Sequence, residues 1–192
     1  MRTPFVQHLL ERGLTEDISH WIDYVCEIVT FPLFGVDKAY RGYQRYAWDQ
    51  PKIRSNLGRY YTWISPGYRP LAFWGMEYVS PYLARCAGRE VASDSPLIIV
   101  EGIFDALRVI QCGFRACAIL TATPSPLFVG WFNQLTLRQR KIAIKDNDGQ
   151  KSGLDKLAQY AIMSEWHKDL GDHTVEEADE WLRETLSELD VR

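Results

Sequence analysis

"LIIVEGIFDALRVIQCGFRACAIL", residues 97–120, is the stretch that decides the fold. Its first four residues, 97–100, are all apolar and predict a short buried strand. Apolar side chains then recur at helical spacing over residues 104–111, until Gly113 ends the helix. A second apolar strand follows over residues 116–120. A strand, a helix and a strand in so short a stretch predict a βαβ unit with parallel strands.

The chain beyond this unit continues to alternate between strand and helix patterns. The expected elements are a helix over 126–139, a strand over 141–145, a helix over 153–165 and a last helix from Thr174. Thr174 and Glu177 form a T-x-x-E capping box at the start of that last helix. The sequence therefore predicts an α/β domain with a mainly parallel sheet and flanking helices over residues 94–173, and a C-terminal helix over 174–192.

The N-terminal part has a different pattern. Residues 5–29 show helical spacing interrupted at 13–17, which predicts two short helices in an N-terminal helical segment, residues 1–30. Residues 31–75 alternate aromatic and polar side chains between glycines and prolines, as short antiparallel strands do, and a connecting helix is expected over 76–93. Residues 31–93 are thus expected to form a small mixed α+β lobe.

Composition excludes some classes of protein. The 192 residues carry a formal charge of −3, which argues against a chain that coats nucleic acid nonspecifically, although basic residues gather within 38–69. The four cysteines, Cys26, Cys86, Cys112 and Cys117, form no zinc-binding pattern, so we expect reduced core thiols and no zinc. With no leader and no long apolar run, we expect a cytoplasmic protein that has no membrane contact.

Acidic residues follow two of the predicted parallel strands directly. Glu101 follows the strand at 97–100, and Asp146 and Asp148 follow the strand at 141–145. If these strands are neighbours, about 4.8 Å apart, the carboxylates converge at one edge of the sheet. Clustered carboxylates favour a bound cation, and oxygen ligands without His or Cys indicate Mg²⁺ or Mn²⁺. Aspartates after a strand are also ordinary turn formers, and a solvated glutamate at a strand end is common.

These residues resemble a known family. "LIIVEGIFDAL" (97–107), "KIAIKDNDGQKSGLDKLAQYA" (141–161) and "HKDLGD" (167–172) are similar to the Toprim domain of bacterial and phage DnaG-type DNA primases. Looser matches in the preceding lobe, "FPLFG", "RGYQRY", "RYYTWISP" and "YRPLAFWG", follow the order of the primase lobe that meets template and nucleotide. The zinc-binding and helicase modules of such primases have no counterpart here, as expected for a phage-type catalytic core.

The resemblance implies roles for individual acids. Glu101, Asp146 and Asp148 are expected to be catalytic and to bind metal, with Glu101 as a ligand or as the base that takes the hydroxyl proton. Asp105 is expected either to join the metal site or to cap the helix that follows. Asp169 and Asp172 are expected to be supporting acids or solvated loop residues, and Asp172 follows one residue later than the family spacing.

Basic residues and one threonine are expected to contact the nucleotide or the template, although each basic residue could equally be a solvated surface charge. They are Arg41, Arg45, Lys52, Arg54, Arg59, Arg69, Lys168 and Thr121. Tyr43, Tyr60 and Tyr61 are expected either to stack on bases or to pack within the lobe.

The resemblance implies a primase catalytic core that makes short RNA primers by metal-dependent nucleotidyl transfer during phage DNA replication. Its cofactor would be Mg²⁺ or Mn²⁺, its substrates NTPs, and its partners a single-stranded DNA template and a replicative helicase or a separate template-recognition subunit. The compartment would then be the host cytoplasm. A Toprim metal-dependent nuclease, or a non-catalytic DNA-binding replication accessory protein, are the alternatives.

Overall fold

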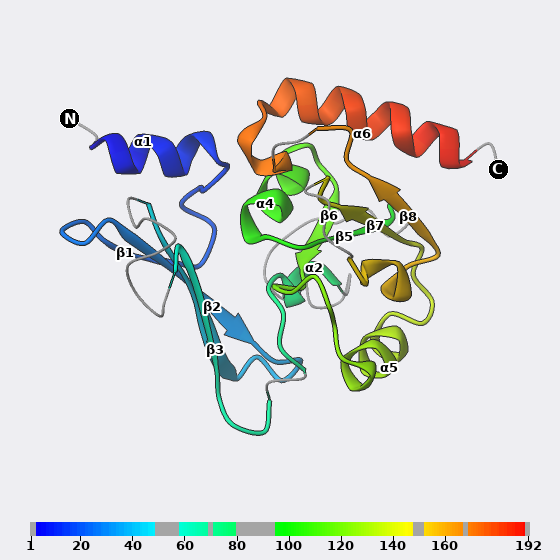
Figure 1. Cartoon of the computed structure of the whole chain (residues 1–192), viewed down its shortest axis with the longest axis horizontal. Helices are drawn as coiled ribbons and strands as arrows, with labels where there is room; N and C mark the ends of the chain where they lie inside the picture. The colour runs from blue at the N-terminus through cyan, green and yellow to red at the C-terminus, as the bar shows by residue number, and fades with distance from the viewer. Residues whose placement is uncertain are drawn as a thin grey trace.

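The computed structural model describes residues 3–48, 58–68, 71–79, 95–147, 152–166 and 169–190. It contains an antiparallel sheet and a parallel sheet, each with four strands, which lie side by side (Figure 1). None of the described helices is both long enough and apolar enough to cross a membrane.

The antiparallel sheet is a meander in which each strand pairs with the next. Its strands are β1 (Trp21–Asp23), β2 (Ile28–Phe34), β3 (Tyr40–Ala47) and β4 (Tyr60–Ile64). Along β2, Val29, Phe31 and Leu33 are buried and face the core, because successive side chains point to opposite faces of a sheet. The expectation of short antiparallel strands in this lobe is confirmed.

The helix α1 (Pro4–Glu11) precedes this sheet and matches the first predicted helix. The second predicted helix is wrong, because its residues form β1 and the start of β2. Asp23 accepts hydrogen bonds from the backbone N–H groups of Val25 and Cys26, and Glu27 has φ 52°, which together make a hairpin turn. The apolar spacing fitted a helix, but local turn chemistry and strand pairing overrode that pattern.

The parallel sheet has the strand order β6-β5-β7-β8. Its strands are β5 (Leu97–Val100), β6 (Arg115–Ala118), β7 (Lys141–Lys145) and β8 (Tyr160–Met163). The strands β5 and β7 are hydrogen-bonded neighbours in parallel register, with Leu97 opposite Lys141. The predicted βαβ unit is confirmed, and the condition on which the convergence of the acids depended, that these two strands are neighbours, is met.

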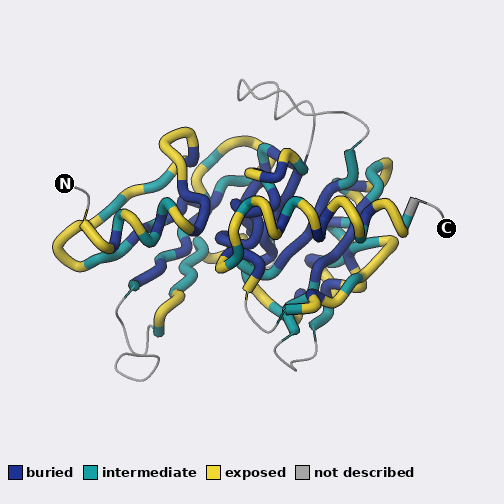
Figure 2. The backbone as a smooth tube through the Cα atoms, turned by 90° about the horizontal axis from the view of Figure 1, so that it is seen from above, coloured by how far each residue is buried: buried dark blue, intermediate teal, exposed yellow. Residues whose placement is uncertain are grey.

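Helices cover both faces of the parallel sheet. Ile98, Val100 and Ile142 point to the face covered by α4 (Ile103–Gln111) and α6 (Val175–Asp190). Ile99 and Ala143 point to the other face, covered by α5 (Pro126–Leu135), the 3-10 helix η2 (Leu154–Leu157) and the short helix α2 (Met76–Val79). Figure 1 shows α6 and α5 on opposite sides of the sheet, and Figure 2 shows buried strands between them. A strand buried on both faces reads as a continuous apolar run, which is why 97–100 was recognisable.

The helix predicted over 153–165 is wrong. The chain there forms η2 and then β8, whose backbone pairs with β7 as the outer strand of the sheet. The helix predicted over 126–139 ends earlier, at Leu135, and Thr136 follows as its C-cap. Of the connecting helix predicted over 76–93, only α2 lies within the described residues.

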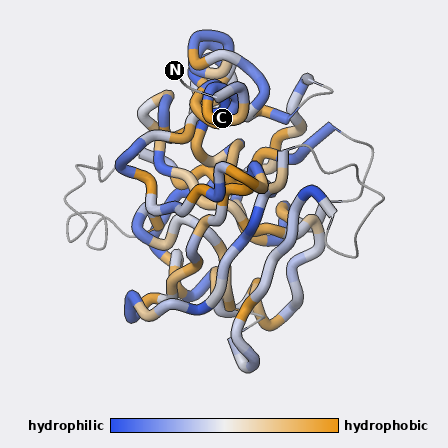
Figure 3. The backbone as a smooth tube through the Cα atoms, turned by 90° about the vertical axis from the view of Figure 1, so that its left-hand side faces the viewer, coloured by the Kyte–Doolittle hydropathy of each residue, from blue (hydrophilic) through white to orange (hydrophobic). Residues whose placement is uncertain are grey.

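Aromatic side chains join the two sheets into one core. The ring of Phe104 at the start of α4 packs edge-on against Phe31 and Tyr46, with centroid distances of 5.7 Å and 5.0 Å. Trp74 exchanges two backbone hydrogen bonds with Ala118 at the end of β6. Figure 3 shows hydrophobic stretches in the middle of the molecule and hydrophilic stretches mostly at its periphery. The N-terminal lobe is therefore fixed against the strand ends of the parallel sheet.

The last helix is a packed core helix. Ala178, Leu182 and Leu186 are buried in the cluster that α4 also enters, and the predicted capping box between Thr174 and Glu177 is formed in both directions. The apolar side chains of this helix therefore pack into the core of the parallel-sheet domain.

The cysteines divide into two groups. Cys112 and Cys117 are buried free thiols, and burial raises the pKa of both, to about 11 for Cys112, so they are unreactive core residues. Cys26 is exposed, which corrects the expectation that it is a core thiol, because it lies in the hairpin turn between β1 and β2. Cys86 lies outside the described residues.

Candidate active site

Acidic side chains from separate segments line one cavity at the carboxyl ends of the parallel strands. Glu101 follows β5 and Asp146 follows β7, and both border a cavity of about 340 Å³ together with Asp105 and Asp169. The parallel register places the ends of β5 and β7 side by side. Open α/β sheets bind their ligands at this edge. Asp148 lies outside the described residues.

A glycine occupies the turn between β5 and α4. Gly102 is the N-cap of α4, and a Cβ atom there would lie only 2.6 Å from Oδ2 of Asp105. The small residue thus lets Asp105 approach the backbone between Glu101 and the helix. Sequence reasoning expected Asp105 either to cap this helix or to join the metal site, and the structure shows its carboxylate lining the cavity.

Asp105 also connects α4 to a distant segment. Its Oδ1 accepts a hydrogen bond of 2.8 Å from the backbone N–H of Gly171, in the 3-10 helix η3 (Leu170–Asp172). Burial, with a further contribution from the nearby Asp169 carboxylate, raises the pKa of Asp105 to about 6. The hydrogen bond from Gly171 and the charge of Arg12 oppose this rise only in part. Asp105 is therefore poised to change charge near neutral pH.

Gly171 is held from several sides by α4. Arg108, one helical turn after Asp105, donates from Nη2 towards the Gly171 carbonyl at 3.5 Å. A Cβ atom on Gly171 would lie 2.8–3.0 Å from backbone and Cβ atoms of Phe104, so only glycine fits. The contacts between α4 and Gly171 fix the two acids near Gly171 in the chain. Asp169 borders the cavity, whereas Asp172 forms an ion pair with Arg12.

Sequence reasoning missed Arg12, which is the cation of this cavity. Its side chain is only 7% exposed, and its guanidinium lies over the Phe104 ring, 4.2 Å from the centroid. Its Nε lies 2.9 Å from Oδ1 of Asp172, and its Nη2 lies 3.6 Å from Oδ2 of Asp169. Arg12 follows the last residue of an N-terminal helix, where an arginine usually indicates a solvated helix end, so no local pattern indicates its burial.

Arg12 also connects the cavity to the N-terminal lobe. Its Nη1 donates a hydrogen bond of 3.1 Å to the hydroxyl of Tyr60, and Tyr60 and Gln44 form the lobe's side of the cavity. Burial alone would lower the pKa of Arg12, but Tyr60 and Asp172 outweigh it and raise that pKa. For Tyr60, burial has the opposite effect and raises the pKa to about 12, so the hydroxyl stays protonated. Arg12 thus remains charged beside the acids.

The three predicted basic residues that the structure describes, Arg41, Arg45 and Arg59, do not line the cavity. Gln44 lines the cavity, so the next residue along β3, Arg45, points to the opposite face of the sheet, where it lies over the Tyr61 ring. Arg41 lies at the irregularity in the pairing of β2 with β3, and it is ion-paired with Asp37.

The other predicted contact residues have different placements. Arg59 is exposed beside Tyr60, and Thr121, after β6, borders the acid-lined cavity as expected. Tyr43 packs against Tyr61 and stacks on Trp63, away from the cavity. The remaining predicted contact residues, Lys52, Arg54, Arg69 and Lys168, lie outside the described residues.

The donor set at the cavity suits a hard divalent cation by type, since Glu101, Asp146 and Asp169 offer only carboxylate oxygens. Within the described ranges, however, no three His, Cys, Asp or Glu side chains are grouped closely enough to hold an ion. Asp148, the remaining predicted ligand, falls in the gap between residues 147 and 152.

The sequence matches no protein-family model, and no curated protein shows significant sequence similarity to it. Solved structures do match. A DnaG catalytic core superposes with a TM-score of 0.62 at 15% identity, over 97% of this chain and 74% of that one. The RNA polymerase domain of Mycobacterium tuberculosis primase DnaG gives 0.59 at 14% identity, over 95% of this chain and 62% of that one.

A DnaG primase catalytic domain bound to single-stranded DNA gives a TM-score of 0.51 at 17% identity, over 93% of this chain and 56% of that one. The present chain thus spans about three-fifths of the length of the Mycobacterium tuberculosis domain. At such low identity the likeness establishes the fold. The predicted architecture, a mainly parallel sheet with flanking helices after a small mixed α+β lobe, is confirmed, and it matches the fold of the DnaG catalytic core.

Proposed function

We propose that this chain is a DNA primase catalytic core, which makes short RNA primers on a single-stranded DNA template by metal-dependent nucleotidyl transfer. The observation that carries the proposal is the meeting of Glu101, Asp146 and Asp169 around one cavity in a fold of the DnaG type. These acids come from separate segments of the chain, so turn formation alone does not explain their common placement.

Mg²⁺ or Mn²⁺ is the proposed cofactor, held by Glu101, Asp146 and Asp148, with Asp169 in support. When bound, such an ion would neutralise the triphosphate and favour ionisation of the attacking 3′-hydroxyl. Asp105 is proposed as a positioning residue rather than a ligand, because its Oδ1 is already engaged by the N–H of Gly171.

The protein side chains have separate tasks in this proposal. Glu101 binds the ion or takes the proton of the 3′-hydroxyl, as an open carboxylate at the cavity can do either. Arg12 holds Asp169 and Asp172 in place and limits their mutual repulsion. Gln44 and Tyr60 line the cavity on the lobe side.

DNA binding is proposed from the same likeness. One structural neighbour is a DnaG primase catalytic domain bound to single-stranded DNA, and the acid-lined cavity of this chain opens between the lobe and the sheet, where a strand could enter. A replicative helicase or a separate template-recognition subunit, and a phage origin, remain predictions from the family resemblance.

The test is a primer-synthesis assay with single-stranded DNA, labelled NTPs and either Mg²⁺ or Mn²⁺. The wild-type protein is expected to release short labelled RNA, and Glu101→Gln and Asp146→Asn are expected to abolish it while leaving the fold intact. Asp155→Asn serves as the matched control, since Asp155 is an exposed acid in η2 away from the cavity.

The same assay separates the alternatives. Shortening of the template instead of RNA synthesis would support a nuclease. Binding of DNA with neither product would support a non-catalytic replication protein. Unchanged product from both Glu101→Gln and Asp146→Asn would reject the assignment of the acids.

A further inference from the structure

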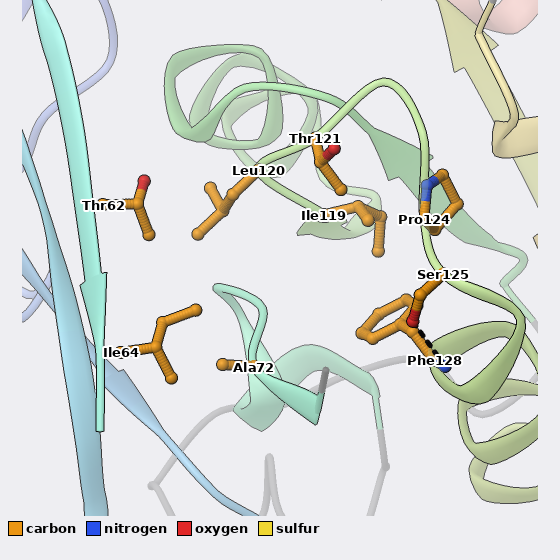
Figure 4. Close-up of a pocket in the computed structure, with 9 residues that line it drawn as sticks. All are labelled: Thr62, Ile64, Ala72, Ile119, Leu120, Thr121, Pro124, Ser125 and Phe128. Atoms are coloured by element: carbon orange, nitrogen blue, oxygen red, sulfur yellow. Dashed lines mark hydrogen bonds between the residues drawn. The ribbon is translucent and has the colours of Figure 1, made fainter. Parts of the chain in front are cut away.

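A second cavity adjoins the acid-lined one. It has a volume of about 490 Å³, within the usual range for small-ligand sites, and Leu120 and Thr121 line both cavities (Figure 4). We call it the side cavity. Its other walls come from β4, from Ala72 and from the start of α5. A ligand with two linked parts could therefore occupy both cavities at once.

The two cavities differ in chemistry. No charged residue is among the described lining of the side cavity, where Ile64, Ala72, Ile119 and Phe128 give apolar walls. Figure 4 shows the side chains of Ile64 and Ala72 on one side of the space and those of Ile119 and Phe128 on the other. A flat, uncharged group fits between such walls, whereas the acid-lined cavity suits ion-bound phosphates.

Three hydroxyl groups of the side cavity are already oriented by the protein. Thr62 accepts a hydrogen bond of 3.0 Å from Nε2 of Gln44, which itself lines the acid-lined cavity. Thr121 accepts from the backbone N–H of Thr123, and Ser125 accepts from that of Phe128, each at 3.2 Å. Each hydroxyl can still donate its hydrogen, so the cavity offers donors to a ligand that carries acceptor atoms.

The shared wall is under backbone strain. Leu120 has φ 64°, a conformation that costs a residue with a side chain free energy. The strand-like hydrogen bonds of Ile119 to Val100 and of Leu120 to the Glu101 carbonyl hold the segment in place. Such strain persists where the surrounding structure enforces it, and ligand-binding sites are a common location.

We propose that the side cavity binds the nucleoside part of an NTP whose phosphates occupy the acid-lined cavity. The base lies between the apolar walls, and the hydroxyls of Thr62, Thr121 and Ser125 donate to its acceptor atoms or to those of the sugar. This inference rests on the proposed function. It adds the site that would receive the base, one wall of which is formed by β4, the strand that carries Thr62.

The test compares the binding of ATP and of inorganic tripolyphosphate, each with Mg²⁺, by calorimetry. Ala72→Leu, which fills the side cavity, is expected to weaken ATP binding by roughly tenfold, equivalent to about 1.4 kcal/mol, and to leave tripolyphosphate binding unchanged. Ala161→Leu is the matched control, because Ala161 is exposed on β8, and it should change neither.

A second variant covers the case in which Ala72→Leu does not fold. Thr62→Val keeps the shape of the side chain and removes the hydroxyl, so it is expected to weaken ATP binding by about fivefold with no effect on tripolyphosphate. Suppose that the wild-type protein binds ATP and makes primers. If both variants then bind ATP as tightly as the wild type does, the inference is wrong while the proposed function stands. A wild type that binds neither probe overturns both.

Discussion

Asp105→Asn should stabilise the protein in a strongly pH-dependent way. Asp105 is buried beside Asp169, and burial raises its pKa from 3.8 to about 6. The folded state therefore binds the proton more tightly than the unfolded chain does. Asp105 therefore does not reduce the free energy of unfolding of the wild type below pH 3.8, where it is protonated in both states. The wild type loses stability as the pH rises from there through about 6, the pKa of Asp105 in the folded state.

The size of the effect follows from the two pKa values. The difference, about 6 minus 3.8, is about 2 pH units, and each unit corresponds to about 1.4 kcal/mol. Ionised Asp105 thus costs the wild type about 3 kcal/mol of unfolding free energy at pH 8. Asparagine cannot ionise, and its side-chain oxygen can still accept the hydrogen bond from Gly171 that Oδ1 of Asp105 accepts now.

The measurement is urea unfolding followed by tryptophan fluorescence, in EDTA, from pH 4 to pH 8. The Asn variant should match the wild type to within about 0.5 kcal/mol at pH 4 and exceed it by up to about 3 kcal/mol at pH 8, with the same m-value. Asp155→Asn, at an exposed position, should show no such trend. A gap that does not grow with pH, or an Asn variant that is less stable at pH 8, would refute the argument that burial controls this carboxyl.

Four further substitutions test the packing around the site, one helix interior and one helix cap. Gly171→Ala should destabilise the protein by about 1–3 kcal/mol in urea unfolding, because the new Cβ atom would meet the Phe104 backbone at 2.8 Å. Gly130→Ala is the contrasting variant: its new Cβ atom would have nothing within 4 Å, so it should stabilise α5 by up to about 1 kcal/mol. Arg12→Met should lower the free energy of unfolding by about 1–3 kcal/mol. It should also raise the pKa of Asp105 further in an NMR titration, because the Arg12 guanidinium lowers that pKa in the wild type. An unchanged pKa would contradict an interaction between Arg12 and Asp105. Thr174→Ala should lower thermal stability by about 1 kcal/mol through loss of the capping box, and equal stability would show that the cap is unimportant.

The parallel sheet and its strand-end acids could be predicted from the sequence because their signals are local. A strand buried on both faces must be apolar at every position, as 97–100 is, and an acid directly after such a strand must emerge at its carboxyl end. Glu101 and Asp146 therefore reach the same edge of the sheet in any fold that pairs β5 with β7 in parallel.

The errors arose where one pattern serves two structures. The apolar spacing at 18–29 fits a helix, but Asp23 and Glu27 make a hairpin turn there. Residues 160–163 also looked helical, yet they pair with β7 because the outer edge of the sheet offers them hydrogen-bond partners. Strand pairing depends on residues distant in the sequence, so neither outcome could be decided locally.

The sequence by itself determined the βαβ unit over residues 97–120 and the placement of Glu101 and Asp146 directly after buried strands. Only the tertiary structure decided that Arg12 is buried against Phe104, that Arg45 faces away from the acids, and that a cavity without charged residues in its described lining lies next to the acidic one. The physical reason is that a strand end is fixed by short-range hydrogen bonding and burial. The surroundings of a charge instead depend on which distant surfaces pack together.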